Sequence, residues 1–358
     1  MPAIERDVRI RLAQQELPAM TTANSAISTL TNTTAPYPWL IADIGGSNAR
    51  FGWVAASGAG ITHVQTLAVS DFATPIAASE AYLQRLQQQT GTTYQAPRCA
   101  AFAVATAVGQ DQISFTNSHW SFSQATVKAA LQLDRFIVLN DFEALALSLP
   151  CLNAAQVRAH DALPQHTGTL AVVGPGTGLG VGSVIETRHG WIAIPGEGGH
   201  ATLAASDDFE ASVLAHARAE FSHVSAERLL SGIGMPVLYR AVARTLYETP
   251  QELSTEQIVE RGLSGQDTVC AKTLDCFCAL LGSFCGSIAL TVGARSGLYI
   301  GGGIVPRLGD YFFQSRFRTQ FEAKGRLHPY LQQIPTALII DTLAALSGAA
   351  FAIEQSEV

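Results

Sequence analysis

The sequence predicts an α/β fold in which two halves of the chain are built alike. Short apolar runs alternate with longer segments of helical periodicity, the pattern of proteins whose helices cover a largely parallel sheet. A strand, a glycine-rich turn and a second strand occur at residues 40–54, and the same order returns at residues 170–184. The length of 358 residues also favours two domains over one. We therefore expect a duplicated fold with two lobes.

The individual elements follow from these periodicities in chain order. Short apolar runs predict strands over 39–44, 50–55, 99–104, 136–140, 170–173, 181–186, 191–194, 298–300 and 337–341. Helical spacing predicts helices over 76–89, 124–131, 142–149, 207–221, 236–247, 255–262, 268–292 and 343–355. Some boundaries carry local signals: Ser206 precedes two acidic residues that suit a helix N-terminus, Pro236 suits a first helical position, and Pro150 ends a helix.

The composition excludes several classes of protein. Apolar residues make up 47% of the chain and charged residues 14%, so the chain is not intrinsically disordered. A net charge of −7 excludes a nucleic-acid binder that works through bulk positive charge. The three lysines are Lys128, Lys272 and Lys324, and none follows a glycine. A Walker A loop is therefore absent.

No segment predicts export or membrane insertion. The first 36 residues mix both charge signs and lack the apolar core of a signal peptide, and residues 1–37 are expected to form a flexible tail. The uncharged stretch Cys276–Ala294 contains Gly, Ser and Thr, which favours a buried core helix over a membrane span. Four of the six cysteines lie between Cys270 and Cys285, and we interpret them as small buried apolar side chains. Reduced cysteines fit a cytoplasmic protein.

The first glycine-rich turn combines flexible backbone with polar side chains. It contains Asp43, Gly45, Gly46, Ser47 and Asn48. Consecutive amides in such a turn can cradle phosphate oxygens, and Asp43 could position Mg²⁺ through water. An ordinary hairpin with a Gly-Gly turn explains the same residues, and both interpretations stay open.

Two further glycine clusters occur in the second half. Gly174 to Gly182 has glycine at every second position, including Gly176 and Gly178 on either side of Thr177. Each glycine costs up to ~1 kcal/mol relative to alanine, so this excess favours close approach of a ligand. The run Gly301–Gly303 could accommodate the flat face of a base or simply turn the chain. None of the clusters forms a Rossmann fingerprint, because none fits G-x-G-x-x-G.

Several polar residues could carry out chemistry. Asn140 and Asp141 end a buried strand at the start of a helix, where α/β folds bind ligands and where a helix cap is equally expected. Glu197 and His200 lie among glycines with little packing reason, and Glu227 follows about thirty residues later. His216, Glu220 and His223 have metal-like spacing on a predicted helical face. We interpret them as a solvated face, because no H-E-x-x-H motif is present.

In combination, these motifs resemble those of the bacterial ATP-dependent glucokinases. The matching segments run 43–50, 140–142, 174–182, 195–200, 223–232 and 301–307, and the resemblance covers about Trp39 to Phe351. The chain is similar to the branch that lacks the zinc-binding C-x-C-G-x-x-G-C signature of the repressor/ORF/kinase sugar kinases.

The resemblance implies a two-lobed actin/hexokinase-like fold of duplicated ribonuclease H-like halves, with a cleft between the lobes. The small lobe would span 38–150 plus 341–358 and the large lobe 151–340. The implied activity is phosphorylation of D-glucose at the 6-hydroxyl, with ATP and Mg²⁺ as cofactors, in a cytoplasmic homodimer that contacts no nucleic acid or membrane.

Carried over residue by residue, the resemblance also implies the site. Asp141 would be the general base, and the sugar contacts would be Asn140, Asp141, Glu197, His200 and Glu227. The ATP contacts would be Asp43, Gly45, Gly46, Ser47, Asn48, Gly176, Thr177, Gly178, Gly301, Gly302 and Gly303, with Asp43 holding Mg²⁺ through water. The alternatives are a kinase for another hexose, such as mannose or an N-acetylated sugar, an actin-like ATPase, and a non-catalytic sugar sensor.

Overall fold

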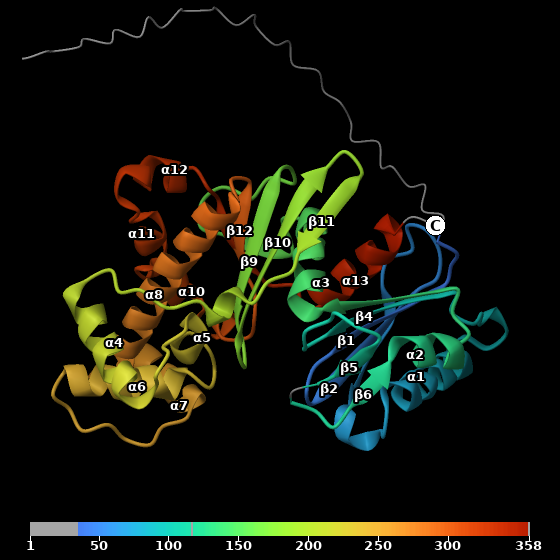
Figure 1. Ribbon diagram of the computed structural model, residues 1–358, viewed down its shortest axis with the longest axis horizontal. Helices are drawn as coiled ribbons and strands as arrows, with labels where there is room; N and C mark the ends of the chain where they lie inside the picture. The colour runs from blue at the N-terminus through green and yellow to red at the C-terminus, as the bar shows by residue number, and fades with distance from the viewer. Residues whose placement is uncertain (1–34, 116, 357–358) are drawn as a thin grey trace, which may run out of the picture. The chain divides into compact units, whose positions relative to one another are not determined.

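A computed structural model describes residues 35–115 and 117–356, and these belong to one compact unit (Figure 1). The predicted tail lies outside the described residues except for its last three. The described chain contains a five-stranded sheet, a six-stranded sheet and a small two-stranded sheet. The mixed α/β class expected from the sequence is confirmed.

The first sheet is built from strands of the first half. Its order is β3 (Thr62–Ala68), β2 (Asn48–Val54), β1 (Trp39–Ile44), β4 (Cys99–Val104) and β7 (Arg135–Asn140). Strands β1, β4 and β7 are parallel, whereas β2 and β3 run antiparallel to their neighbours. The carboxyl ends of the parallel strands therefore meet at one edge, which brings Asp43 and Asn140 to the same end of the sheet.

The second sheet repeats this arrangement. Its order is β11 (Gly190–Ile194), β10 (Leu179–Thr187), β9 (Thr169–Pro175), β12 (Gly297–Ile300), β13 (Thr336–Ile339) and β8 (Val157–Ala159). Strands β9, β12 and β13 are parallel, and β10 and β11 form antiparallel hairpins beside β9. The sequence β3-β2-β1-β4-β7 thus corresponds strand by strand to β11-β10-β9-β12-β13. The duplication predicted from the two glycine-rich turns is present in the sheet topology.

Helices cover both faces of each sheet. In the first half, α1 (Pro75–Thr90) and α2 (Gln124–Ala130) pack on one face and α13 (Ala344–Gln355) on the other. The remaining helices are α4 (Asp208–Glu220), α5 (Ala226–Leu229), α6 (Met235–Thr245), α7 (Thr255–Leu263), α8 (Thr268–Val292), α9 (Val305–Leu308), α10 (Asp310–Gln314), α11 (Phe317–Glu322) and α12 (His328–Gln332). Strands β5 (Gln112–Ser114) and β6 (Ser121–Ser123) form the small sheet.

Helix α3 (Asp141–Ser148) connects the two sheets. It contacts β4 and β7 of the first sheet and β9, β10 and β11 of the second, and it packs along α13 (Figure 1). A Cβ at Gly348 would lie 1.7 Å from the Ala144 carbonyl oxygen, so glycine is required where the α13 backbone meets α3. Because Asp141 is the first residue of α3, the packing of this helix determines where that carboxyl lies.

Helix α8 is a core helix. Within the described residues it is the one helix long and apolar enough to cross a membrane, yet its cysteines Cys270, Cys276, Cys278 and Cys285 are fully buried in the protein core. A Cβ at Gly282 would lie 2.1 Å from the Phe317 carbonyl oxygen, which shows that α11 packs directly on this helix. The predictions of a core helix and of buried reduced cysteines are confirmed.

Some predicted boundaries shift by a few residues. Asp207 caps α4 by accepting the Glu210 amide at 2.7 Å, so the expectation that Ser206 precedes the first helical residue is wrong by one position. Pro236 is the second residue of α6. The last predicted strand ends at Ile339 instead of 341, because the Asp341 carboxylate accepts the Leu343 amide at 2.8 Å and turns the chain.

Candidate active site

Asp43 lies half-buried near the end of β1, beside the turn that links it to β2. It is paired across the ladder with Arg50, and the Arg50 guanidinium donates to the Thr342 carbonyl at 2.5 Å. Burial raises the pKa of the Asp43 carboxyl, and the charge of Arg50 opposes that shift. Asp43 is therefore a carboxylate held in a partly dehydrated position next to a glycine-rich turn.

The two glycines of this turn have different roles. A Cβ at Gly46 would lie 2.7 Å from the Asn117 carbonyl oxygen, so glycine is needed there for close packing. At Gly45 a Cβ would meet only the Asn48 carbonyl, at an ordinary 3.7 Å, and the Gly45 amide donates to that carbonyl at 2.9 Å. Ser47 and Asn48 are exposed. The open side of the turn is thus at Gly45, Ser47 and Asn48.

Asn140 is the N-cap of α3. Its Oδ1 accepts the Phe142 amide at 2.9 Å, and its own amide donates to the Glu143 carboxylate at 3.3 Å, which completes a capping box. The Asn140 Nδ2 donates to the Thr106 carbonyl at 3.2 Å. Asn140 is therefore the N-cap, and its side chain already has two protein partners; Asp141 Oδ1 also accepts the Phe142 amide, at 3.0 Å.

Asp141 has a strongly raised pKa. Burial is the main cause, the negative charge of Asp43 adds to it, and that of Glu197 contributes less; together they raise the pKa to about 6 against opposing backbone hydrogen bonds. Asp43 comes from the first sheet, whereas Glu197 follows β11 of the second. Three carboxyl groups from distant segments therefore share one electrostatic environment at the start of α3.

Glu197, His200 and Glu227 lie close together. His200 Nε2 is 4.0 Å from a Glu197 oxygen, and His200 Nδ1 is 3.9 Å from Glu227 Oε1. Both separations exceed hydrogen-bond length, so polar atoms of all three residues remain available to a ligand. Glu227 is held in place because its Oε2 accepts the Leu179 amide at 2.8 Å.

The glycine-rich hairpin of β9 and β10 is explained mainly by packing. A Cβ would lie 2.5 Å from the Phe142 ring at Gly174, 2.0 Å from it at Gly180, and 2.5 Å from the Phe142 carbonyl oxygen at Gly182. The expectation that the excess glycine marks ligand approach is wrong for these three positions, because α3 occupies the space. At Gly178 a Cβ would collide with Glu227 Oε2 at 2.4 Å. Gly176 alone of these glycines faces open space, beside the exposed Thr177.

The segment Gly301–Gly303 packs on the same hairpin. The Gly301 amide donates to the Val173 carbonyl at 2.9 Å, and Gly302 has φ +75° with its α-carbon against the Pro175 carbonyl. A Cβ at Gly303 would meet nothing within 4 Å. Gly303, like Gly176 and Gly45, therefore has room beside it.

A third segment, residues 232–233, also holds this hairpin, a role that the sequence did not predict. The Gly232 amide donates to the Gly176 carbonyl at 2.7 Å, and the Ile233 amide donates to the Thr177 carbonyl at 3.4 Å. Glycines at 232 and 234 were the available signal, since each lets the backbone approach another carbonyl closely. The turn at Gly176–Gly178 is thus flanked by the segments at 232–233 and 301–304.

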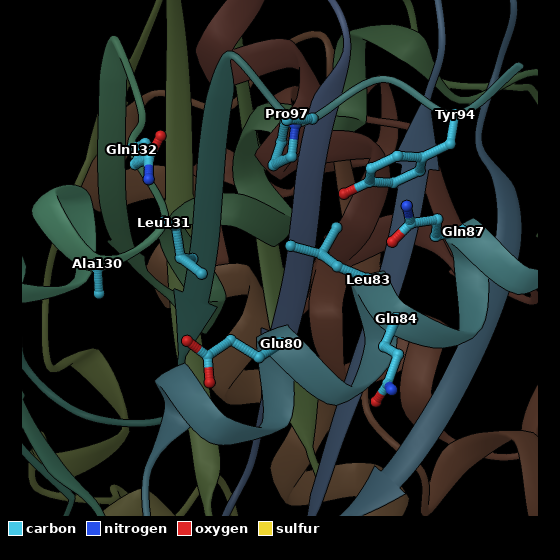
Figure 2. A pocket seen from close by; sticks show the side chains of 10 residues that line it. Glu80, Leu83, Gln84, Gln87, Tyr94, Pro97, Ala130, Leu131 and Gln132 are labelled. Carbon is cyan, nitrogen blue, oxygen red and sulfur yellow. The ribbon is translucent and has the colours of Figure 1, made fainter. Parts of the chain in front are cut away.

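Two other features lie apart from this cluster. Helix α4 ends at Glu220, which pairs with Arg240 and Arg244, while His223 contacts Thr202 beyond the helix, so the predicted His216, Glu220 and His223 face is not one surface. Within the described ranges, no three His, Cys, Asp or Glu residues are placed to hold a metal ion. Figure 2 shows a surface hollow between α1 and the end of α2, and none of the predicted site residues lines it.

Comparison with known proteins identifies the family. A family model described as Glucokinase matches residues 40–356. The chain belongs to the glucokinase family. The glucokinase of Aromatoleum aromaticum is 44% identical over 89% of this chain and 96% of that protein. The resemblance predicted from the motifs is confirmed.

Solved glucokinases share the fold. The crystal structure of a glucokinase from an Antarctic psychrotroph has a TM-score of 0.82 at 36% identity and covers 89% of this chain and 99% of that one. A ROK family glucokinase from Streptomyces griseus, solved in complex with glucose and AMPPNP, has a TM-score of 0.56 at 18% identity and covers 88% of this chain and 98% of that one.

Proposed function

We propose that this glucokinase-family chain transfers the γ-phosphoryl group of ATP to the 6-hydroxyl of D-glucose, which yields ADP and glucose 6-phosphate. Family membership supports the reaction class. The observation in this chain that carries the proposal is the Asp141 carboxyl, whose pKa is raised to about 6 by burial and by the charges of Asp43 and Glu197. A carboxylate with this pKa is suited to accept a proton near neutral pH.

Asp141 acts as the general base in this proposal. The glucose 6-oxygen forms a bond to the γ-phosphorus while the bond from that phosphorus to the β–γ bridging oxygen breaks. The hydroxyl proton passes to the Asp141 carboxylate, and ADP leaves. Phosphoryl transfer has a loose transition state, so the remaining work of the protein is to position both substrates and stabilise charge.

The phosphates of ATP bind at the two glycine-rich turns in this proposal. Open backbone is present at Gly45 and Gly176, next to the exposed hydroxyls of Ser47 and Thr177. The lysines are elsewhere: Lys272 pairs with Asp275, Lys324 donates to Ser283, and Lys128 lies on α2. The Gly45 and Gly176 amides donate to the Asn48 and Gly178 carbonyls, so the hydroxyls and the remaining amides of the two turns would replace the lysine of a P-loop.

The acidic side chains fit a magnesium ion that is held mainly by the nucleotide. Asp43 and Asp141 repel each other electrostatically, and Arg50, the cation that acts on Asp43, also donates to a backbone carbonyl. Magnesium typically binds through one or two carboxylates together with phosphates and water. Asp43 would hold the ion through water, and the ion would supply neutralisation of the β- and γ-phosphate charge.

Glucose contacts the polar group formed by Asn140, Asp141, Glu197, His200 and Glu227 in this proposal. The distances of 3.9–4.0 Å around His200 leave acceptors and a ring nitrogen for sugar hydroxyls. Carboxylates and an imidazole that a bound sugar covers discriminate between sugars, because a missing or inverted hydroxyl then leaves a covered polar group unpaired. This requirement favours one hexose over its epimers.

The two sheets correspond to two lobes in this proposal, with the reaction in a cleft between them. The small lobe would contain 38–150 plus 341–358 and the large lobe 151–340, each lobe of ribonuclease H-like type. The supporting observation is that every strand before Asn140 belongs to the first sheet or to the small β5–β6 pair, whereas those after it form the second. Closure would exclude water and limit ATP hydrolysis.

A coupled assay over a panel of sugars and donors tests the proposal. We expect glucose with MgATP to give the highest kcat/KM, and we expect no ATP hydrolysis at a comparable rate without sugar. A preference for mannose or an N-acetylated sugar would assign the chain to another hexose, and sugar-independent hydrolysis would indicate an actin-like ATPase. Glucose binding without turnover would indicate a sensor.

Assembly and location follow from the family resemblance alone. We expect a homodimer in the cytoplasm. Sedimentation velocity of the purified chain and fractionation of cells test these two expectations separately.

A further inference from the structure

The segment between α5 and α6 presents an apolar side chain to solvent. Ile233 is 62% exposed, although its neighbours Ser231, Gly234 and Met235 are buried. A single exposed aliphatic side chain is common on protein surfaces, so its role depends on what lies beside it. The reaction proposed above does not use this residue.

The backbone of this segment is fixed on both sides. Ser231 Oγ donates to the Glu227 carbonyl at 2.7 Å and accepts the Gly234 amide at 3.0 Å. Thr255 Oγ1, at the start of α7, donates to the Gly232 carbonyl at 2.6 Å. Isoleucine is also stiff at its first side-chain torsion because it is β-branched. Ile233 is thus held in a defined position, and a ligand that covers it loses little conformational freedom.

Ile233 lies beside the turn assigned to the phosphates. The Gly232 and Ile233 amides donate to the carbonyls of Gly176 and Thr177. On the Pro175 side of the same turn, the Ile304 amide donates to the Pro175 carbonyl at 3.2 Å, which brings the open Gly303 to the turn.

The elements that follow these two segments meet as well. Helix α7 contacts α9, and Glu256 on α7 pairs with Arg307 on α9 at 3.4 Å. The turn proposed for the phosphates is thus flanked by an apolar side chain at 233 on one side and by bare backbone at 303 on the other. An apolar side chain and a glycine are the partners that a flat, weakly polar base requires.

We infer that Ile233 forms the apolar contact surface for the base of the nucleotide donor and so selects nucleoside triphosphates over phosphate chains that lack a base. The inference rests on the proposed function, because it assumes that the phosphates bind at the Gly176 turn. It adds a residue that determines which donor is used, separate from the residues that act on glucose.

The test compares nucleotide binding in Ile233→Ala, Ile233→Val and wild type. Calorimetry measures the affinity for AMPPNP and for tripolyphosphate, which carries a similar phosphate chain but no base. We expect Ile233→Ala to weaken AMPPNP binding and raise the KM for ATP about tenfold, because roughly two methyl groups lose their contact with the base. Its kcat, its KM for glucose and its affinity for tripolyphosphate should stay unchanged, and Ile233→Val, which loses one methyl group, should weaken AMPPNP binding only about threefold.

A matched control comes from the same sheet. Ile192 on β11 is another exposed isoleucine, with 56% of its surface accessible, and it has no contact with the Gly176 turn. Ile192→Ala should bind AMPPNP as wild type does. Unchanged AMPPNP affinity in Ile233→Ala, in a chain that phosphorylates glucose, would overturn the inference alone, and so would an equal loss for tripolyphosphate. A wild-type chain that binds no AMPPNP would overturn the proposed function as well.

Discussion

The two glycine-rich hairpins have the same place in their sheets but use their residues differently. In the β1–β2 hairpin, the second residue pair from the turn is Asp43 and Arg50. In the β9–β10 hairpin the corresponding pair is Gly174 and Gly180, and the ring of Phe142 fills the space that side chains would take. The first hairpin carries charged side chains, whereas the glycines of the second leave room for the Phe142 ring of α3.

This difference explains how Asp141 comes to lie beside Asp43. Phe142 directly follows Asp141, so the packing of the Phe142 ring on the glycines of the second hairpin fixes the start of α3. The first hairpin then supplies the carboxylate that helps raise the pKa of Asp141. The first half therefore contributes charge to the site, and the second half positions Asp141.

We expect Gly180→Ala to have the largest effect of the substitutions in the two hairpins. The new methyl group would lie 2.0 Å from the Phe142 ring, so α3 must shift and Asp141 with it. We expect a loss of about 1–3 kcal/mol in the free energy of unfolding, measured by urea titration, and a fall in kcat of about a hundredfold. Phe142→Ala should relieve the clash, so the double variant should lose less stability than the sum of the single ones. If the losses in the free energy of unfolding of the two single variants simply add in the double variant, Gly180 does not make room for the Phe142 ring.

Glu197→Gln tests the contribution of the second half to the sugar site. The substitution keeps the shape but replaces one acceptor oxygen by a donor. If Glu197 accepts from sugar hydroxyls, glucose binding measured by calorimetry should weaken by ~1.5–3 kcal/mol, the range for hydrogen bonds to charged groups. Glu186→Gln is a matched control, because Glu186 lies on β10 and its carboxylate accepts the Gly168 amide. Equal glucose affinity in Glu197→Gln and wild type would remove Glu197 from the pocket.

Gly176→Ala should have the smallest effect and should act on a different property. A Cβ there meets nothing within 4 Å, so the unfolding midpoint should match wild type, in contrast to Gly180→Ala. If phosphate oxygens approach this backbone, the KM for MgATP should rise by about five- to tenfold, roughly 1 kcal/mol, while glucose affinity stays unchanged. An unaltered KM for MgATP would show that Gly176 shapes the turn and does not contact the phosphates.

The sequence sufficed for the main strands, and it singled out Asp43, Asp141 and Glu197, whose charges act on one another in the structure. Strand β4 is apolar throughout, β1 is apolar except for Asp43, and α8 has twenty-five residues of helical spacing, so periodicity predicts them directly. Strand β3 escaped prediction because it is an edge strand whose side chains are mostly exposed and polar. The short helices α9 to α12 were missed because each spans only four to six residues.

The roles of individual glycines could not be predicted for a different reason. Gly180 and Phe142 are distant in the sequence, and only the packing of α3 on β10 shows that one makes room for the other. The cap at Asn140 was ambiguous because Asn and Asp cap helices about equally well. The glycine-rich sequence therefore predicts the hairpin, whereas the role of each glycine is known only from its contacts in the folded protein.

Replacement of Asp141 by asparagine tests whether Asp141 is the base that accepts the 6-hydroxyl proton. Asn140 caps α3, so the substitution leaves the cap intact. The raised pKa means that the ionised carboxyl destabilises the folded state: this destabilisation is absent below pH 3.8 and complete above about pH 6. Asp141→Asn should therefore be more stable than wild type at pH 8, by up to about 3 kcal/mol, and the difference should vanish toward pH 4.

The deciding measurement is kcat of Asp141→Asn at saturating glucose and MgATP, with AMPPNP binding as the check that the nucleotide site is intact. We expect kcat to fall by roughly 10²–10⁴, the range for removal of a general base, in a protein that folds and binds AMPPNP as wild type does. A kcat near that of wild type would contradict the assignment of Asp141, and the proton acceptor would then be sought at Glu197.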